Sequence, residues 1–128
     1  MPGNAYTILL VDDSPIILER ISQILQEVSC ITSVKTAFDF EEAVAVFEKE
    51  TINVALLDIN LPGRNGIQLL TYIKDNYPLV KTIMLTNQSD SFYRNLCKRL
   101  GSDFFIDKSN EFEMITESVI RYYTNSAS

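Results

Sequence analysis

The chain has 128 residues, 46% of them hydrophobic and 22% charged, which is typical of one globular domain with a packed core. Its formal net charge is −6, it contains no histidine, and its eleven lysine and arginine residues are scattered along the chain. Because nucleic-acid binding needs basic residues grouped along a phosphate backbone, we expect no direct nucleic-acid binding by this chain.

The cysteines and the N-terminus indicate where the protein acts. Cys30 and Cys97 lack the spacing of metal ligands and sit among apolar neighbours, which favours a reduced, cytoplasmic setting. The N-terminus lacks a basic start followed by an apolar stretch, and no apolar run approaches the roughly eighteen residues that cross a bilayer. We therefore expect neither secretion nor a membrane span.

Short β-branched runs alternate with amphipathic stretches, which predicts five strand–helix units and a parallel sheet with helices on both faces. The first strand is TILLVDD at 7–13, and Ser14 and Pro15 are an N-cap and a first helical residue. That helix should end near Ser29, with an inward face made of Ile17, Ile21, Ile24, Leu25 and Val28.

The second and third units follow the same plan. A strand at 34–37 precedes Asp39, which with Glu42 makes a capping-box-like helix start. The strand VALLD at 54–58 is apolar on both faces and should be central in the sheet. The glycines and proline of INLPGRNG then enforce a turn. The next helix starts near Gly66 and stops before Pro78.

The fourth and fifth units complete the chain. TIMLT at 82–86 is the fourth strand, and Ser89 or Asp90 caps a helix that ends at Gly101. Its expected inward stripe is Tyr93, Leu96, Cys97 and Leu100. DFFID at 103–107 is the last strand. The last helix should begin around Ser109, Glu111 and Glu113 and bury Ile115, Val119 and Tyr122. We expect a single domain over 1–128, with a core at about 6–123 and flexible ends at 1–5 and 124–128.

Polar residues stand at the carboxyl ends of four of these strands: Asp12, Asp13, Asp58, Thr86 and Lys108. Ligands bind at this edge of an open parallel sheet, so these side chains should converge on one crevice. Neighbouring carboxylates repel one another unless a cation neutralises them, and oxygen ligands without histidine or cysteine suit Mg²⁺, with Mn²⁺ as an alternative. In such a site Asp58 could attack phosphorus, with Lys108 neutralising the phosphoryl oxygens and Thr86 donating a hydrogen bond.

These residues resemble the receiver domain of two-component response regulators from about Tyr6 to Tyr123. The resemblance rests on the Asp12–Asp13 pair, Asp58 followed by LPxxxG, Thr86 after the fourth strand and Lys108 after the fifth, in the family's order. It implies a flavodoxin-like, CheY-like fold with strand order 2-1-3-4-5.

The resemblance also implies residue roles. Asp58 would be the phosphoacceptor, and Asp13, Asp58 and the Asn60 backbone carbonyl would ligate magnesium, with Asp12 acting largely through water. Thr86 and Lys108 would contact the phosphoryl group, and Phe105 would be the aromatic switch that turns inward when Thr86 moves toward the phosphate.

The implied partners are a sensor histidine kinase or phosphotransfer protein upstream and a downstream protein or output domain. The downstream partner would bind the face of the fourth helix, last strand and last helix, and homodimerisation on activation is a family habit. Phe92, Ile120 and Tyr123 lie off the buried stripes and could form part of such a face. The only enzymatic acts expected are phosphotransfer to the chain itself and autodephosphorylation.

The chain departs from the family pattern at Asn87, where a small residue is usual, and at Ser109, where many members have proline. Asn87 could slow phosphorylation. Asn60 and Gln88 stand at positions that, by resemblance, tune the lifetime of the acyl phosphate. We expect no output domain within these 128 residues.

Other functions remain as alternatives. A receiver-like interaction module that works without phosphorylation typically loses the acidic pair, the acceptor or the lysine, and all are present here. A magnesium-dependent phosphatase of the haloacid dehalogenase type would have its nucleophile after the first strand in a DxD arrangement. A flavodoxin-like cofactor binder is rejected, because it would need a Ser/Thr/Gly-rich phosphate loop where this chain has DDSPII.

Overall fold

The computed structural model describes residues 5–86, 91–108 and 113–127, within which five strands alternate with five helices. In chain order the elements are β1 (Thr7–Val11), α1 (Pro15–Gln26), β2 (Ser33–Ala37), α2 (Phe40–Lys49), β3 (Val54–Asp58), α3 (Gly66–Asn76), β4 (Lys81–Thr86), α4 (Ser91–Arg99), β5 (Phe104–Asp107) and α5 (Met114–Ala127).

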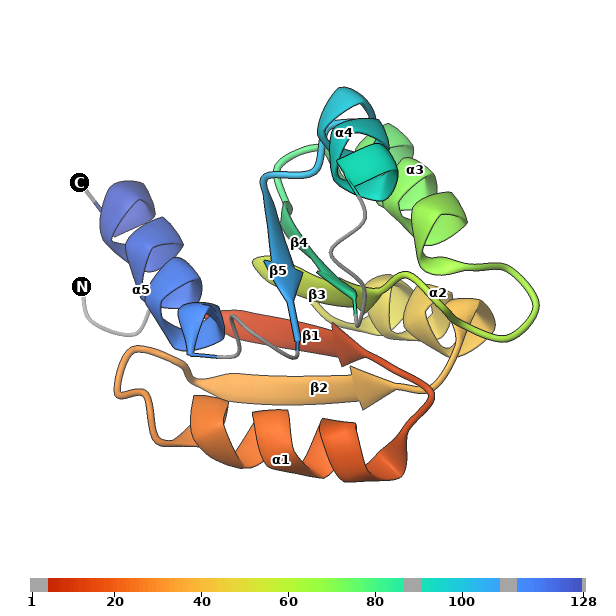
Figure 1. Ribbon diagram of the computed structural model, residues 1–128. Helices are drawn as coiled ribbons and strands as arrows, with labels where there is room; N and C mark the ends of the chain where they lie inside the picture. The colour runs from red at the N-terminus through yellow and green to blue at the C-terminus, as the bar shows by residue number, and fades with distance from the viewer. Residues whose placement is uncertain (1–4, 87–90, 109–112, 128) are drawn as a thin grey trace.

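The strands form one parallel sheet in the order β2-β1-β3-β4-β5, as Figure 1 shows. This confirms the expected α/β class and strand order. Every residue of β3 is buried, because this strand lies at the centre of the sheet and is covered on both faces. Since all strands run in the same direction, their carboxyl ends share one edge, and their amino ends share the opposite edge.

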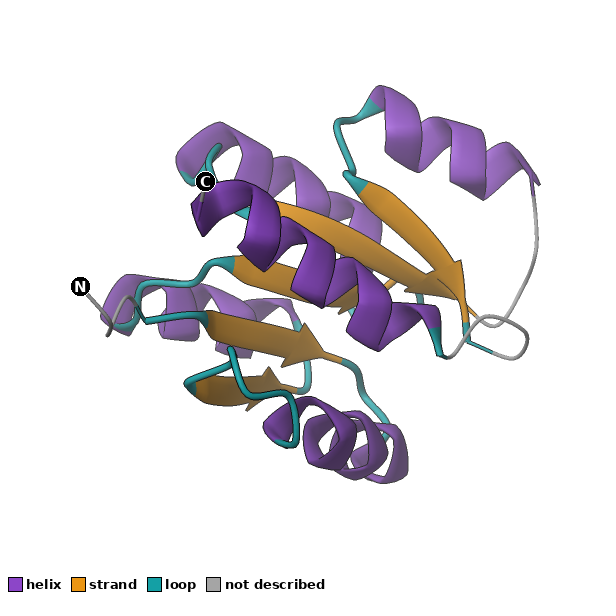
Figure 2. Ribbon diagram, turned by 90° about the vertical axis from the view of Figure 1, so that its left-hand side faces the viewer, coloured by secondary structure: helices purple, strands orange, loops and turns teal. Residues whose placement is uncertain are grey.

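Helices cover both faces of the sheet (Figure 1, Figure 2). Side chains alternate along each strand, so Ile8 and Leu10 of β1 join a core with α1 and α5, whereas Leu9 and Val11 join a core with α2, α3 and α4. Fully burying one such Leu or Ile side chain contributes roughly 1.5–3 kcal/mol. The two cores together hold the strand ends, and hence the polar residues after them, in a defined position.

The helix α1 starts as predicted, but its buried face is narrower than the predicted inward face. The Ser14 hydroxyl accepts a hydrogen bond from the Ile17 N–H at 3.4 Å, and Pro15 occupies the first turn. The buried residues of the helix are Leu18, Ile21 and Leu25. Ile24 is 36% exposed, because it lies at the edge of that stripe, and the helix ends at Gln26, before the expected boundary near Ser29.

Side-chain caps also define α2 and α3. The Asp39 carboxylate accepts from the Glu42 N–H at 2.9 Å, as predicted, while Glu42 accepts from the N–H of Phe38 at 2.8 Å. At the start of α3, Asn65 and Gln68 form a complete capping box that the sequence interpretation above does not include. These caps anchor the loops that enter both helices.

The fourth helix buries less than its sequence pattern predicts. Of its predicted stripe, Cys97 is fully buried, Tyr93 and Leu96 are half-buried, and Leu100 is 37% exposed. The physical reason is position: α4 packs beside β5, at the edge of the sheet, where less core surface is available. Gly101 ends the helix with a φ of +101°, a backbone conformation that favours glycine.

A polar cluster centred on Asp103 joins several elements at the amino edge of the sheet. The Asp103 carboxylate accepts hydrogen bonds from Lys74 of α3 at 3.2 Å and from the Thr82 N–H of β4 at 2.9 Å. The Lys81 ammonium is 4.0 Å from the other carboxylate oxygen. The Tyr122 hydroxyl of α5 donates to the Asp103 carbonyl at 3.1 Å. We call these five residues the Asp103 cluster.

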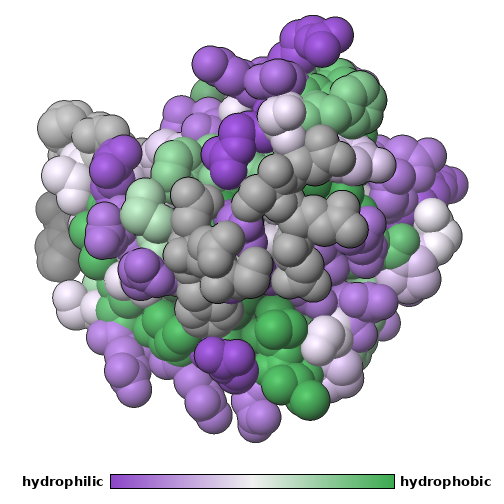
Figure 3. Space-filling model, in the orientation of Figure 1, coloured by the Kyte–Doolittle hydropathy of each residue, from purple (hydrophilic) through white to green (hydrophobic). Residues whose placement is uncertain are grey.

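The surface carries some hydrophobic area. In the view of Figure 3, hydrophobic residues gather on the lower part of the molecule, near α1. Ile16, on the first turn of α1, is 70% exposed, and Phe38, after β2, is 44% exposed. None of the helices within the described ranges combines the length and apolar character that a membrane span requires.

Candidate functional site

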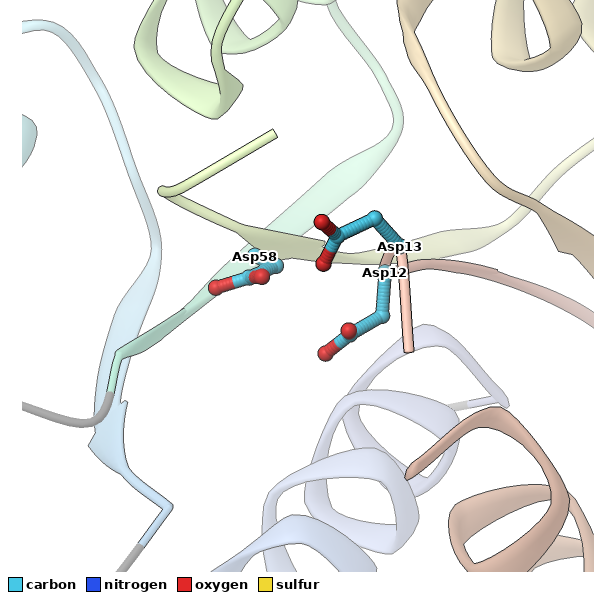
Figure 4. Close-up of side chains that lie close together, drawn as sticks. All are labelled: Asp12, Asp13 and Asp58. Atoms are coloured by element: carbon cyan, nitrogen blue, oxygen red, sulfur yellow. The ribbon is translucent and has the colours of Figure 1, made fainter. Parts of the chain in front are cut away.

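The carboxyl edge of the sheet brings together three carboxylates. Asp12 and Asp13 follow β1, and Asp58 is the last residue of β3, the neighbouring strand. One oxygen from each side chain lies within 4.8 Å of the others, and Figure 4 shows the three carboxylates directed toward a shared space. Asp12 and Asp58 are buried and Asp13 is exposed, so the group opens to solvent on the Asp13 side.

Lys108, the residue after β5, places its ammonium between the two buried carboxylates. Its Nζ lies 2.8 Å from Oδ2 of Asp12 and 3.5 Å from Oδ1 of Asp58, and its side chain is only 5% exposed. Taking charges out of water is costly unless they are paired, so Lys108 offsets part of that cost for both aspartates. The closer pair is with Asp12, a contact that the sequence spacing alone does not predict.

The pKa of Asp58 is raised by its surroundings from 3.8 to about 6. Burial is the main cause, because it disfavours the charged carboxylate, and the negative charge of Asp12 adds to it. The Lys108 ammonium and the Asn60 N–H act in the opposite direction. Asp58 is therefore a more basic carboxylate than a solvent-exposed aspartate, yet still ionised for the most part above neutral pH.

Backbone contacts fix the orientation of these side chains. The Ser14 N–H donates to Oδ1 of Asp12 at 2.9 Å, and the Asn60 N–H faces Oδ1 of Asp58 at 3.4 Å. The N–H of Lys108 donates to the carbonyl of Thr86 at 2.7 Å, which ties the ends of β4 and β5 together. The charged groups thus sit on ordered strand ends and turns.

The loop after Asp58 depends on a glycine. The Gly66 N–H donates to the carbonyl of Ile59 at 2.9 Å, which brings the first residue of α3 against the end of β3. A Cβ atom at Gly66 would collide with the Asp58 carbonyl oxygen and would lie 2.9 Å from Cα of Ile59. The close approach of these two backbones therefore excludes any side chain at this position.

The donor set fits a hard divalent cation. Three carboxylates and one ammonium carry a net charge of −2 when all are ionised (−3 + 1), and all the side-chain ligand atoms are oxygens. Mg²⁺ prefers such oxygen ligands and usually keeps several waters, which the exposed side of Asp13 allows. Asn60 lies two residues after Asp58 and is exposed; the role of its carbonyl as a ligand stays a prediction.

Thr86 and Phe105 lie on the two neighbouring strands β4 and β5. Thr86 is the last residue of β4 and is 3% exposed, and Phe105 is 6% exposed within the core under α2, α3 and α4. Their proposed contacts with a phosphoryl group and their switching role stay predictions. Asn87, Gln88 and Ser109 lie outside the described residues, as do the predicted helix caps Ser89 and Asp90.

Asp107 is a buried polar residue that the sequence interpretation does not include. It is 2% exposed, it is the last residue of β5, and it pairs in register with Thr86. The two-residue alternation along β5 places it on the same face as Phe105, which is buried as well. That alternation is the signal that could have identified it.

Comparison with known proteins identifies the family. The family model described as "Response regulator receiver domain" matches residues 8–120. The chain is similar to the Fimbriae Z protein of Escherichia coli (strain K12), with 27% identity over 113 residues, 88% of this chain and 54% of that protein. It is also similar to the transcriptional regulatory protein DegU of Brevibacillus brevis, with 28% identity over 91% of this chain and 49% of that protein. The chain thus spans about half the length of these curated relatives.

A solved structure supports the same conclusion. The chain resembles the chemotaxis response regulator CheY4 of Vibrio cholerae with a TM-score of 0.82 and 26% identity, over 93% of this chain and 99% of that one. The strand order, the acidic group at the carboxyl edge and the matched range agree with one another. The chain therefore belongs to the family of response regulator receiver domains.

Proposed function

We propose that this receiver domain is a phosphorylation-controlled switch in two-component signalling, and that Asp58 accepts the phosphoryl group from a histidine kinase or phosphotransfer protein. The observation that carries the proposal is the position of the Lys108 ammonium, 3.5 Å from the Asp58 carboxylate and 2.8 Å from Asp12. A carboxylate beside a buried ammonium and a cation-binding group is suited to attack a negatively charged phosphoryl group.

Asp13 and Asp58 would hold the metal ion by their carboxylates and Asn60 by its backbone carbonyl, and Asp12 would act largely through water. Mg²⁺ is the preferred ion because the side chains offer only oxygen donors, and Mn²⁺ is the alternative. When bound, the ion supplies positive charge that neutralises the phosphoryl oxygens.

Asp58, Lys108 and Thr86 would each have a separate role in the transfer of the phosphoryl group. A carboxylate oxygen of Asp58 forms a bond to phosphorus while the bond between phosphorus and the donor's imidazole nitrogen breaks, and that nitrogen keeps the electron pair. Lys108 compensates the charge of the phosphoryl oxygens, and the Thr86 hydroxyl donates a hydrogen bond to one of them. The pKa of about 6 leaves Asp58 ionised above neutral pH, which is the form that attacks.

The state of Asp58 would then be transmitted across the neighbouring strands. Thr86 and Phe105 lie on β4 and β5, so a displacement of Thr86 toward the phosphoryl group reaches Phe105 and the surface of α4, β5 and α5. On that surface Phe92 is 62% exposed and Ile120 is 41% exposed. We propose that a downstream protein or output domain binds there, or a second copy of the chain on activation.

Tyr123 contributes less to this surface than the sequence suggests. It is half-buried, and its ring packs edge-on against Tyr6 with the centroids 4.9 Å apart. Receiver domains are signalling switches rather than enzymes acting on other molecules. We accordingly assign to this chain only phosphotransfer to itself and hydrolysis of its own acyl phosphate.

The test is the intact mass of the protein after incubation with acetyl phosphate, with and without Mg²⁺. We expect a magnesium-dependent gain of one phosphoryl group that Asp58→Asn abolishes. Asp75→Asn, which makes the same change at an exposed position on α3, is the matched control and should keep the gain. A full gain in Asp58→Asn would place the acceptor elsewhere. Absence of a gain both with acetyl phosphate and with a phosphorylated histidine kinase would contradict the function itself.

A further inference from the structure

The side chain of Phe105 lies between two environments. On its inner side it belongs to a core that also contains Met84, its register partner on β4, and Cys97 of α4. On its outer side it helps to line a surface cavity of about 310 Å³ between α4 and β5. In the structure the ring is 6% exposed, so it occupies the inner environment.

The cavity is large enough to hold the Phe105 ring in a second position. An apolar cavity of about 150 Å³ is large enough for benzene, so a volume of about 310 Å³ exceeds what a phenyl ring needs. Its lining comprises Arg94, Lys98, Ser102, Asp103, Phe104 and Phe105 itself. Rotation of the Phe105 side chain would therefore exchange a core position for one in this cavity.

Arg94 contacts the Phe105 ring directly. The carbon at the centre of its guanidinium group lies 4.7 Å from the centroid of the Phe105 ring, within the range of a cation–π contact. The contact is made to the ring in its buried position, and Arg94 also lines the cavity that a rotated ring would enter. Lys98, one turn further along α4, lines the same cavity with the same charge.

We propose that Arg94 is a positioning residue that holds Phe105 in its buried position and so biases the switch before any phosphoryl group binds. The significance of this bias for signalling rests on the proposed function; the effect of Arg94 on the ring does not. A partly exposed cation–π contact shifts such an equilibrium by about two- to fivefold. By linkage, a ligand that requires the buried ring binds less tightly when Arg94 is removed, by the factor by which the buried fraction falls, which is at most about fivefold.

The first test follows the ring itself by nuclear magnetic resonance. The readout is the cross-relaxation between the Phe105 ring protons and the Met84 methyl group, with the Phe105 signal assigned by Phe105→Leu. Arg94→Ala should lower the buried-to-rotated ratio about two- to fivefold, Arg94→Lys should restore part of it, and Lys98→Ala should leave it unchanged. A ratio unchanged in Arg94→Ala, or lowered equally in Lys98→Ala, would overturn the proposal.

The second test measures the coupling to the phosphorylation site. The apparent affinity for beryllofluoride with Mg²⁺ should fall in Arg94→Ala by the same factor as the buried fraction of the ring, and should be unchanged in Lys98→Ala. Wild-type affinity in Arg94→Ala despite a shifted ring would overturn the claimed bias. If wild-type protein binds no beryllofluoride, the proposed function fails, whereas the ring measurement on the protein alone still decides the role of Arg94.

Discussion

Replacing Asp58 with asparagine should stabilise the metal-free protein, and the gain should grow with pH. Burial and the charge of Asp12 raise the pKa of the Asp58 carboxyl from 3.8 to about 6 in the folded protein, against the opposing effect of Lys108. Between these two values the folded state binds more protons than the unfolded state, so the free energy of unfolding falls as pH rises. The favourable contribution is complete below pH 3.8 and is lost as pH passes through about 6.

The magnitude follows from the size of the shift. A difference of about two pKa units corresponds to about 3 kcal/mol, since each unit is worth about 1.36 kcal/mol. Asp58 is only 5% exposed, so screening by solvent does not reduce this figure much. Relative to wild type, we expect Asp58→Asn to raise the free energy of unfolding by about 3 kcal/mol at pH 7.5 and by about 1 kcal/mol at pH 4.5.

Urea denaturation followed by circular dichroism, with a chelator present, measures both values. Asp75→Asn, an exposed position, should show little change at either pH. An Asp58→Asn protein no more stable than wild type, or one with the same gain at both pH values, would refute the reasoning. Added Mg²⁺ should narrow the gap, because it stabilises the wild-type protein by binding its folded state.

Three further predictions concern the site and its supports. Gly66→Ala should lower the free energy of unfolding by about 2–3 kcal/mol, because its Cβ meets the Asp58 carbonyl. Gly63→Ala, whose Cβ meets nothing within 4 Å, should lower it by about 1 kcal/mol, because a φ of +68° disfavours alanine. Urea titration compares the two, and a loss in Gly66→Ala no larger than that in Gly63→Ala would contradict the clash. Mg²⁺ should raise the melting temperature of the protein, and Asp13→Asn should need at least about tenfold more Mg²⁺ for the same rise in calorimetry. An unchanged dependence on Mg²⁺ would remove Asp13 from the ligand set. Asp103→Ala should lower the free energy of unfolding by about 1–3 kcal/mol, because the Thr82 N–H and the Lys74 ammonium lose their acceptor. If urea denaturation gives the same stability as wild type, water has replaced the Asp103 carboxylate as the acceptor.

Much of the fold follows from local patterns in the sequence. The apolar run at 54–58 predicts a central strand, and Ser14 with Pro15 predicts the start of α1, because each signal depends on neighbouring residues alone. The inward stripe assigned to the fourth helix is less accurate. Periodicity shows which residues share a side of a helix, but the amount of core beneath that side depends on the edge position of α4 in the sheet.

The sequence predicts which residues form the site better than it predicts the distances between them. Parallel strands must end at one edge, which is why Asp12, Asp58 and Lys108 could be expected to converge. That Lys108 lies nearer to Asp12 than to Asp58 depends on side-chain directions and on burial, which strand order does not specify. The contact of Arg94 with Phe105 likewise joins a helix and a strand through the shape of the surface between them.

The Asp103 cluster holds α3, β4 and α5 together, whereas α4 has little buried surface. At the amino edge, Asp103 joins α3, β4 and α5 through hydrogen bonds with Lys74, Thr82 and Tyr122. Beside β5, α4 buries little, and Phe105 borders a cavity that also reaches Asp103. We expect α3, β4 and α5 to stay in place at the amino edge, while α4, whose fully buried residue is Cys97, is displaced more easily when the end of β4 moves.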